Sequence, residues 1–353
     1  IRIFCFQCLL LYFYSRMKIG TLQLPDQPVI LAPMEDVTDP PFRYMCKKFG
    51  ADLMFSEFVS SDALIRNVNR TLEKMEIQAY EHPYGIQLYG KNIVAMVESA
   101  KITETWGPDL IDINFGCPVK KVAMKGAGAG MLVDVPKMIK MTREIVRATK
   151  LPVTVKTRLG WDDNSKNIVE IAEMLQDTGI MALTIHGRTR AQMYRGEADW
   201  TLIGEVKNHP RIKIPIIGNG DITDPVETKK AFDRYGVDGI MIGRAAIGRP
   251  WIFRDVKHYL KTGEILPPMT VGDQIDLIKE HLELGFSFKD DRRGVVSMRR
   301  FFAVSFKGLS NFKETRIRLL QAEGKELVYQ ILEEIREKWG DQLLIPVPSK
   351  EEK

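Results

Sequence analysis

The sequence predicts an α/β protein, a TIM (β/α)8 barrel with a small C-terminal all-helical domain. Between residues 29 and 260, short apolar segments alternate with amphipathic helical patterns, which favours parallel strands joined by right-handed crossovers. Eight such units span roughly 230 residues, close to the ~250 residues that are typical of this barrel. Beyond residue 262 the alternation ends and only helical patterns follow.

The expected strands are short, apolar and bounded by turn-forming residues. They are Val29–Ala32, Leu53–Ser56, Tyr84–Leu88, Leu110–Ile113, Val153–Thr157, Ala182–Ile185, Ile214–Ile217 and Gly239–Ile242. Helices expected between them include Val135–Ala148, Ser165–Asp177 and Pro225–Arg234. An open doubly wound sheet is the alternative. Such a sheet usually carries a Gly-x-Gly-x-x-Gly turn after its first strand, whereas this strand ends in Ala32-Pro33-Met34.

The chain is expected to divide into four parts. Residues 1–16 are apolar and aromatic but shorter than the ~20 residues of a membrane span, so we expect an extraneous or disordered segment with Met17 as the native start. Weak membrane attachment is the alternative. Residues 17–262 are expected to form the barrel, residues 263–345 a small all-helical domain, and residues 346–353 a frayed tail. The helices expected in the second domain are Val271–Phe288, Val295–Lys307 and Thr315–Trp339.

Composition is that of an ordinary globular protein, with 44% hydrophobic and 27% charged residues. Four cysteines in 353 residues exclude a disulfide scaffold and fit a reducing cytosol, so a cytoplasmic protein is expected. Cys5 and Cys8 form a Cys-x-x-Cys without a second pair, and no metal site is expected. Between Lys289 and Leu320, nine Lys or Arg residues stand against three Asp or Glu, which permits a polyanionic partner.

A lone cysteine follows the fourth expected strand. The segment Asp112-Ile113-Asn114-Phe115-Gly116-Cys117-Pro118 leads from a buried strand through a glycine-flanked turn to a thiol, and Pro118 blocks further ladder pairing. The Gly-rich run at residues 125–130 is typical of a loop that a ligand approaches. Cys117 is therefore a candidate proton donor or nucleophile. The alternative is a half-buried structural thiol, because the environment sets the reactivity of a cysteine.

Polar or special residues stand at all eight expected strand ends. In a TIM barrel the C-terminal ends of the strands face the active site, whereas the opposite ends serve stability. The residues are Met34, Glu57, Gln87, Asn114 with Cys117, Lys156 with Arg158, His186, Asn219 with Asp221, and Gly243 with Arg244. Solvation alone does not explain eight such ends in a row, so we expect one site.

The last two strand ends predict a phosphate site. The segments Asn219-Gly220-Asp221 and Gly243-Arg244 put glycines where backbone N–H groups approach an anion, and barrel loops 7 and 8 are the usual phosphate-binding place. Arg244 adds a guanidinium that can bind phosphate through two hydrogen bonds. The alternative is that these glycines only make tight turns.

Three further residues extend this site toward a ring-shaped ligand. Lys156 is expected near the barrel axis, either paired with Glu57 or Asp112 or holding negative charge on a reduced cofactor. Gln87 offers an amide donor and acceptor, which suit a ring with N–H and C=O edges. His186 is either a satisfied core histidine or a contact to cofactor or substrate. The pattern as a whole is that of a flavin mononucleotide barrel.

The chain resembles the tRNA-dihydrouridine synthases, particularly the bacterial DusB-like branch. The resemblance covers roughly residues 24–260 in seven ordered motifs, and it weakens through residues 307–309. The motifs are Ala32-Pro33-Met34 with Val37-Thr38-Asp39 and Pro41-Phe42-Arg43, Gln87-Leu88-Tyr89-Gly90, the Asp112–Pro118 segment, Lys156-Thr157-Arg158, His186-Gly187-Arg188-Thr189, Gly218-Asn219-Gly220-Asp221 and Gly243-Arg244-Ala245. The chain departs from the family after Met34, where Glu35-Asp36 replaces the usual Ala-Gly.

The resemblance implies FMN as cofactor and a uridine in tRNA as substrate. In the reaction that the resemblance implies, NADPH, or NADH, would reduce the FMN, a hydride would pass from flavin N5 to uracil C6, and Cys117 would protonate C5. The implied flavin contacts are Pro33, Met34, Gln87, Lys156, His186, Asn219, Gly220, Asp221, Gly243 and Arg244. Asn114 is implied to hold the uracil, and Arg158, Arg299 and Arg300 are expected to contact the RNA substrate. The helical domain at residues 263–345 would then bind tRNA through its basic residues, which contact the phosphates. The uridine must leave its base stack before it can lie against a flavin.

Two other functions stay open at this point. One is a dihydroorotate dehydrogenase-like flavoprotein, against which the basic C-terminal helices argue. The other is an RNA-binding barrel that has lost catalysis, against which Lys156 and Cys117 argue. A monomer is expected. The sequence does not indicate which uridine is modified.

Overall fold

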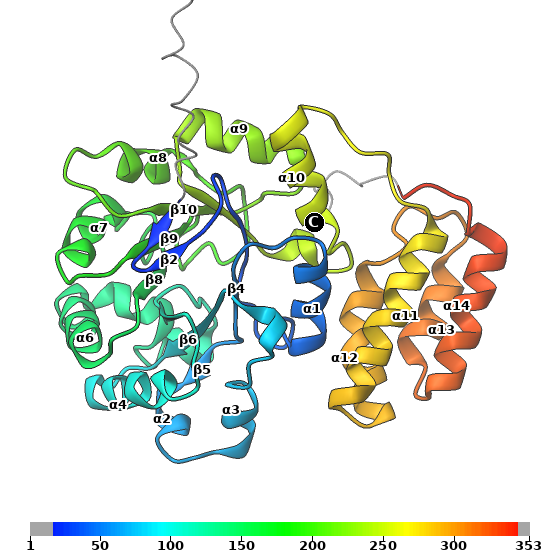
Figure 1. Cartoon of the computed structure of the whole chain (residues 1–353), viewed down its shortest axis with the longest axis horizontal. Helices are drawn as coiled ribbons and strands as arrows, with labels where there is room; N and C mark the ends of the chain where they lie inside the picture. Colours follow the sequence, from blue (N-terminus) through cyan, green and yellow to red (C-terminus); the bar gives the residue numbers. More distant parts are fainter. Residues whose placement is uncertain (1–16, 345–353) are drawn as a thin grey trace, which may run out of the picture.

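The computed structural model describes residues 17–344, and it confirms the barrel with its C-terminal helices (Figure 1). Eight strands pair in parallel around the barrel, and a bridge between Ile30 and Leu53 joins its two ends. The strands are β3 (Val29–Leu31), β4 (Met54–Phe55), β6 (Tyr84–Tyr89), β7 (Leu110–Asn114), β8 (Val153–Arg158), β9 (Ala182–His186), β10 (Ile216–Asn219) and β11 (Gly239–Ile242), with β5 (Val59–Ser60) paired beside β6. The expected segments at residues 1–16 and 346–353 lie outside the described residues.

Helices cover the outside of the barrel between successive strands. They are α1 (Pro40–Lys48), α2 (Ser61–Leu64), α3 (Asn69–Glu73), α4 (Ile93–Glu104), α5 (Lys120–Ala123), α6 (Val135–Ala148), α7 (Ile168–Gln176), α8 (Thr201–Asn208), α9 (Pro225–Tyr235) and α10 (Ile252–Thr262), with short 3-10 turns η2 (Ala79–Glu81), η3 (Gly128–Val133) and η4 (Arg244–Ala246). Asp224 caps α9 by accepting a hydrogen bond from the Glu227 backbone N–H, and Gly236 ends it in the left-handed region at φ 66°. None of the described helices is long and apolar enough to cross a membrane.

The alternation of side chains along β7 explains how the barrel separates its core from its site. Ile111 and Ile113 pack outward against the helices, whereas Leu110, Asp112 and Asn114 point inward. At the N-terminal end of the strands the interior is apolar; toward the C-terminal ends it becomes polar. The inward positions thus supply both a barrel core and the floor of a site.

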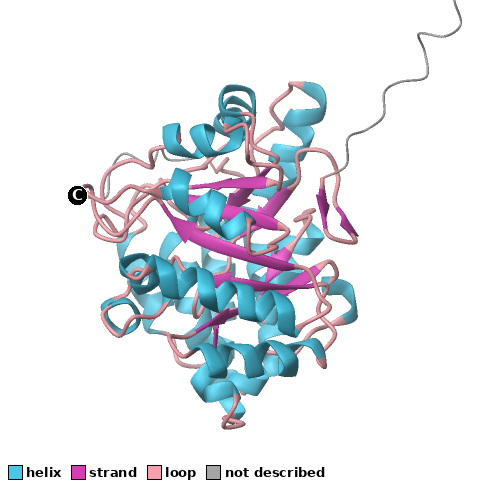
Figure 2. Cartoon of the chain, turned by 90° about the vertical axis from the view of Figure 1, so that its left-hand side faces the viewer, coloured by secondary structure: helices cyan, strands magenta, loops and turns pink. Residues whose placement is uncertain are grey.

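A hairpin closes the N-terminal end of the barrel, and no sequence pattern predicts it because each strand is only two residues long. Strands β1 (Lys18–Ile19) and β2 (Leu22–Gln23) pair antiparallel. Ile19 belongs to a buried apolar cluster of the hairpin and the barrel interior, whose other members include Leu24, Ile30, Leu110, Ile217 and Met241. Figure 2 shows the hairpin at one end of the barrel and long loops at the other.

Several expected element ends need correction. The strand predicted at Ile214–Ile217 starts at Ile216, because Pro215 lacks the N–H that a ladder needs. The strand predicted at Leu53–Ser56 is limited to β4. The helix predicted at Ser165–Asp177 is α7, which begins later, after Asn167. The helix predicted at Val295–Lys307 begins earlier, because the Asp290 side chain caps it by accepting a hydrogen bond from the Arg293 backbone N–H.

The C-terminal helices form a bundle of α11 (Val271–Phe288), α12 (Asp291–Val304), α13 (Lys313–Gln321) and α14 (Lys325–Trp339). The single helix predicted over Thr315–Trp339 is wrong. Ala322 and Gly324 have extended backbone, so the chain turns between α13 and α14 and both helices pack in the bundle. Glycine weakens a helix at this point and permits the turn.

The bundle rests on α1 of the barrel, and Figure 1 shows α1 and α10 facing it. The ring of Phe42 lies 5.0 Å from that of Phe301 and 6.0 Å from that of His281, centroid to centroid. Lys289 Nζ lies 2.7 Å from Asp39 Oδ2, so an ion pair adds to this apolar contact. These ring contacts and the ion pair hold the loop after β3 and the start of α1 against the bundle.

We predict that Gly218→Ala destabilises the barrel by about 1–3 kcal/mol, the cost typical of overpacking. A Cβ on Gly218 would lie 2.1 Å from the Trp200 ring, which is buried and donates a hydrogen bond to the Gly220 carbonyl. Urea unfolding measures the effect. Gly285→Ala in α11 is the control, because its Cβ would meet nothing within 4 Å and alanine favours helix. An unchanged unfolding midpoint for Gly218→Ala would contradict this packing.

Candidate active site at the barrel mouth

The polar strand ends converge at the C-terminal end of the barrel, as the sequence predicts. Strand register sets Gln87 beside Asp112, Asn114 beside Lys156, and His186 beside both Arg158 and Asn219. Within each strand these residues share the inward-facing parity. The site is therefore built on strands, which hold side chains more rigidly than loops do.

A chain of hydrogen bonds fixes the cysteine turn. Asn114 Oδ1 accepts from the backbone N–H groups of Gly116 and Cys117, both at 2.9 Å. Asn114 Nδ2 donates to Gln87 Oε1 at 2.7 Å, and Gln87 Nε2 donates to Asp112 Oδ2 at 2.6 Å. Three adjacent side chains thus connect the barrel interior to the turn that carries Cys117.

Cys117 is 7% exposed, and its sulfur makes no disulfide. Burial raises the pKa of the thiol, while the Val119 N–H and the charges of Arg158 and Lys156 oppose that rise. The thiol therefore keeps its proton at neutral pH. Such a group is suited to donate a proton and poorly suited to act as a nucleophile, because the thiolate is the nucleophilic form.

Positive charge gathers where β8, β9 and β11 end, whereas Glu35 and Glu57 lie on the loops after β3 and β4. The four cations at those three strand ends are Lys156, Arg158, Arg188 and Arg244; among residues 17–344, Asp221 is the one carboxylate within ion-pair distance of any of them. Lys156 Nζ has a neutral partner instead, Asn219 Oδ1 at 3.2 Å. Its loss of water contact and the nearby Arg158 lower the pKa of Lys156 to about 8. Among the described residues, Lys156 does not form the alternative ion pair with Glu57 or Asp112.

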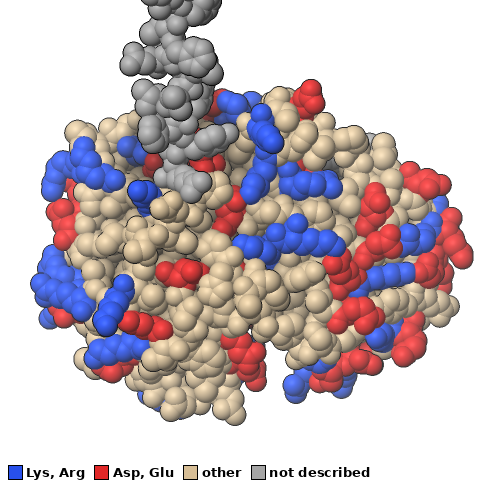
Figure 3. All heavy atoms as spheres, viewed as in Figure 1, with Lys and Arg blue, Asp and Glu red and all other residues tan. Residues whose placement is uncertain are grey.

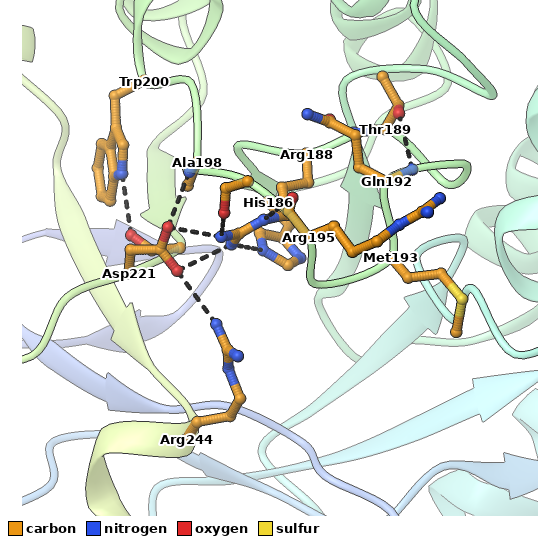
Figure 4. A network of polar contacts seen from close by, with 12 residues as sticks. His186, Arg188, Thr189, Gln192, Met193, Arg195, Ala198, Trp200, Asp221 and Arg244 are labelled. Carbon is orange, nitrogen blue, oxygen red and sulfur yellow. Dashed lines mark hydrogen bonds and ion pairs between the residues drawn. The ribbon is translucent and has the colours of Figure 1, made fainter. Parts of the chain in front are cut away.

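Asp221 brings together the arginines that follow β9 and β11 (Figure 4). Arg188 donates two hydrogen bonds to its carboxylate, at 2.8 and 2.7 Å, and Arg244 adds one at 3.1 Å. The Ala198 backbone N–H donates to the same carboxylate at 2.8 Å. Arg188 is 2% exposed, whereas Arg244 is half exposed. Arg244 can thus meet a ligand while Arg188 fixes the loop after β10.

His186 is neutral in this setting. Burial, followed by the charges of Arg158, Lys156 and other nearby arginines, lowers its pKa well below the usual value. Arg188 Nη1 lies 3.4 Å from Nε2 of the imidazole, and a guanidinium can only donate, so Nε2 accepts and the ring proton lies on Nδ1. His186 therefore offers a neutral N–H donor at the mouth.

Arg158 is buried rather than free to meet RNA. Its Nε donates to the Gly116 carbonyl at 2.7 Å, and its Nη1 donates to the carbonyls of Thr189 and Met193. It ties the cysteine turn to the loop after β9. Tyr194 in that loop is half exposed, with the guanidinium carbons of Arg158 and Arg244 at 5.7 and 5.0 Å from its ring centroid.

The remaining predicted flavin contacts lie in the loops of the same mouth. A Cβ on Gly243 would lie 3.6 Å from the Met34 sulfur, so these two residues adjoin. A Cβ on Gly220 would lie 3.2 Å from the His186 ring, and the backbone there has φ +130°, which favours glycine. Pro33, next to Met34, is partly buried.

The two predicted RNA contacts on α12 differ in position. Arg299 Nη2 donates to the Ala322 carbonyl inside the bundle. Arg300 Nη2 lies 3.9 Å from Asp36 Oδ2 in the loop after β3, so it faces the barrel mouth loops. Some of the basic excess counted along the sequence is neutralised; for example, Arg318 pairs with Glu334. Figure 3, which views the molecule from the hairpin side, shows acidic and basic side chains intermixed over the bundle.

Two buried residues of this site, Arg188 and the inward-facing Asp112, are not among the contacts predicted from the sequence, where Asp112 appears only as a possible partner of Lys156. Both follow the parity of their strands, since Arg188 continues the inward series of β9 and Asp112 that of β7. That signal was available in the sequence. In the described part of the chain no group of three or more His, Cys, Asp or Glu residues is placed to hold a metal ion.

Comparison with known proteins yields one family. The family model described as dihydrouridine synthase matches residues 30–340. A relative named probable tRNA-dihydrouridine synthase, from Rickettsia conorii, is 42% identical over 301 residues, covering 85% of this chain and 90% of the relative. A second, tRNA-dihydrouridine synthase B from Pseudomonas aeruginosa, is 38% identical over 314 residues, covering 88% of this chain and 94% of the relative.

Solved structures are similar in fold only. Histamine dehydrogenase from Rhizobium sp. 4-9 aligns with a TM-score of 0.52 at 13% identity, covering 77% of this chain. 2-Naphthoyl-CoA reductase aligns with a TM-score of 0.52 at 13% identity, covering 69% of this chain. The chain spans about half the length of each, 50% and 52%. These likenesses support the barrel architecture.

Proposed function

The chain belongs to the dihydrouridine synthase family, and from that premise we propose that it reduces the C5–C6 double bond of uridines in tRNA, with FMN as cofactor and NADPH as reductant. One observation carries this proposal. A proton-bearing thiol and an excess of buried positive charge share one barrel mouth. The reaction needs both a proton donor and a site for an anionic cofactor.

The residues at the mouth fit FMN. Lys156 is a partly buried cation without a carboxylate partner, and such a group is costly unless an anion joins it. Gly220 and Gly243, with Arg244, would hold the phosphate, and Lys156 would stand by the ring. Gln87 and the neutral His186 would supply hydrogen bonds, with Pro33, Met34, Asn219 and Asp221 completing the contacts. When bound, FMN supplies the hydride, which NADPH replenishes.

The chain's own residues supply the second half of the reaction. Addition of a hydride at C6 leaves negative charge on the uracil, and Cys117 neutralises it by giving its proton to C5. Asn114, held between Gln87 and the turn, orients the uracil. Arg158 keeps the thiol in place by holding the Gly116 carbonyl. Arg158 therefore serves the substrate by positioning the turn.

In the proposed function, the C-terminal helical bundle binds the tRNA. Arg300 stands next to the mouth loops and would bind a phosphate beside the extruded uridine, in place of Asp36. Arg299 supports α12 through its contact to Ala322. We also propose that the barrel and the helical domain meet between residues 262 and 263. The protein is proposed to be a cytoplasmic monomer.

We predict that the affinity for reduced FMN, whose ring carries the negative charge beside Lys156, falls as pH rises through about 8. An anion favours the charged form of Lys156, whose pKa is about 8 in the ligand-free chain, so binding takes up a proton above that pH. The loss is up to about tenfold per pH unit. His186 does not contribute, because its pKa lies well below neutrality. Anaerobic binding measurements with reduced FMN between about pH 7 and 9.5 give the slope. A flat profile would show that Lys156 does not meet the anion.

The proposed function is tested by incubating the purified chain with FMN, NADPH and unmodified tRNA, and measuring dihydrouridine by mass spectrometry. Dihydrouridine that requires NADPH supports the proposal. Oxidation of dihydroorotate in place of tRNA reduction would favour the related flavoprotein. Bound flavin and bound tRNA without NADPH oxidation would favour a barrel that has lost catalysis. Mapping dihydrouridine in tRNA from cells with and without the protein identifies the uridine.

A further inference from the structure

The buried carboxylate of Asp112 lies below the proposed site and has no assigned role. It is 1% exposed, and its two oxygens accept hydrogen bonds of 2.6 Å from Gln87 Nε2 and Thr154 Oγ1. In residues 17–344 no cation lies within ion-pair distance of it. A carboxylate is costly to bury without a cation, so packing alone does not explain an aspartate here.

The distinctive property of a carboxylate is that, when ionised, it only accepts hydrogen bonds. It therefore draws the Nε2 end of the Gln87 amide toward itself, and Oε1 turns to Asn114. Asn114 must then offer Nδ2 to Gln87, which leaves Oδ1 for the backbone N–H groups of Gly116 and Cys117. Each amide could otherwise rotate by half a turn at little steric cost. Asp112, at one end of this chain of hydrogen bonds, thus sets which group donates and which accepts at every later step.

We propose that Asp112 is a positioning residue, which fixes the amide orientations of Gln87 and Asn114 and through them the turn that presents Cys117. The inference rests on the proposed function, since Gln87 and Asn114 are the predicted contacts to flavin and uracil. Thr154 donates to the other oxygen of Asp112, Oδ1, and the bond between Oδ2 and Gln87 does not depend on it. Asp112 itself touches neither substrate nor cofactor.

Two substitutions separate orientation from charge. Asp112→Asn removes the charge, and its oxygen can still accept from Gln87 while its amide nitrogen donates to the Thr154 hydroxyl, so the wild-type order of hydrogen bonds survives in the molecules with that amide orientation. Asp112→Leu removes the acceptor and leaves no space for a replacing water. We expect dihydrouridine formation by the flavin-loaded enzyme to stay within about threefold of wild type in the first variant and to fall about 100-fold in the second, the cost of misplacing a reacting group by about 1 Å.

A readout without cofactor tests the turn directly. Alkylation of Cys117 by iodoacetamide, followed by mass spectrometry at that residue, should accelerate in Asp112→Leu and remain at the wild-type rate in Asp112→Asn. A purely structural role would not produce this pattern in variants with equal thermal stability. Thr154→Val is the matched control, because it removes one hydrogen bond of Asp112 and leaves the bond to Gln87. It should keep both the alkylation rate and activity.

A double-mutant cycle keeps the inference falsifiable if Asp112→Leu folds poorly. With Gln87→Leu already present, Asp112→Ala should cost little further activity, because the two residues act through the same chain of contacts. Additive losses would overturn the inference, as would an Asp112→Asn enzyme as slow as Asp112→Leu. A wild-type chain that forms no dihydrouridine contradicts the proposed function instead, and the alkylation comparison still decides the role of Asp112.

Discussion

Cys117→Ala should abolish dihydrouridine formation while leaving flavin and tRNA binding intact. The thiol is buried at the barrel mouth, and burial raises its pKa, so it carries a proton at neutral pH. A positioned general acid contributes about 10²- to 10⁴-fold to a rate, and we expect a loss in that range. Single-turnover formation of dihydrouridine by NADPH-reduced enzyme measures it, with flavin absorbance and tRNA affinity taken on the same preparation.

Cys46→Ala is the matched control for this experiment. Cys46 is the other free cysteine among the described residues, and it is fully buried in α1 away from the mouth. Its loss should leave activity near wild type. Undiminished product from Cys117→Ala would remove this thiol from the mechanism. Loss of bound flavin in the same variant would assign Cys117 to the pocket wall rather than to proton transfer.

The raised pKa of the Cys117 thiol also determines how proton transfer depends on pH. Because burial raises the pKa of the thiol, proton donation persists across neutral pH and declines only where the thiol ionises. Lys156 loses its charge earlier, near pH 8. Alkaline loss of cofactor binding should therefore precede alkaline loss of proton transfer.

The barrel is predictable from the sequence because each strand is an apolar segment with a polar residue at its end. Gln87, Asn114, Lys156, His186 and Asn219 are brought together by register alone, which eight parallel strands impose. The hairpin at the N-terminal end is not predictable in this way, because two-residue strands leave no periodic pattern. Its recognition depends on the barrel interior that it covers.

Which residues lie in the site is easier to predict than which partners their polar groups contact. Arg158 and Arg299 were predicted to meet RNA because they are basic, yet both donate to backbone carbonyls. An acidic partner is one of two alternatives that the sequence leaves open for Lys156, and its partner is the Asn219 amide. These contacts join residues that are far apart in the sequence and meet across the barrel. A local sequence pattern therefore does not predict them. Strand parity, by contrast, identifies Asp112 and Arg188 as inward-facing.

Replacement of Lys156 by methionine should reduce function and spare stability. The ammonium group stands near Arg158 and has no carboxylate partner, so its removal relieves repulsion in the ligand-free chain. We therefore expect an unfolding temperature equal to or above that of wild type. Dihydrouridine formation should fall about 10²- to 10³-fold, as when one preorganised group that stabilises developing charge is lost.

Lys121→Met is the matched control, because Lys121 is exposed on α5 and lies outside the cation cluster. Calorimetry of the ligand-free proteins, FMN titration and single-turnover rates together give the comparison. The affinity of Lys156→Met for reduced FMN should also lose its dependence on pH near 8, because the titrating group is gone. A destabilised Lys156→Met that still binds FMN with the wild-type pH profile would mean that this lysine supports the barrel fold. The stable but inactive variant is the expected result, because a site prepared for an anion carries unpaired positive charge until that anion binds.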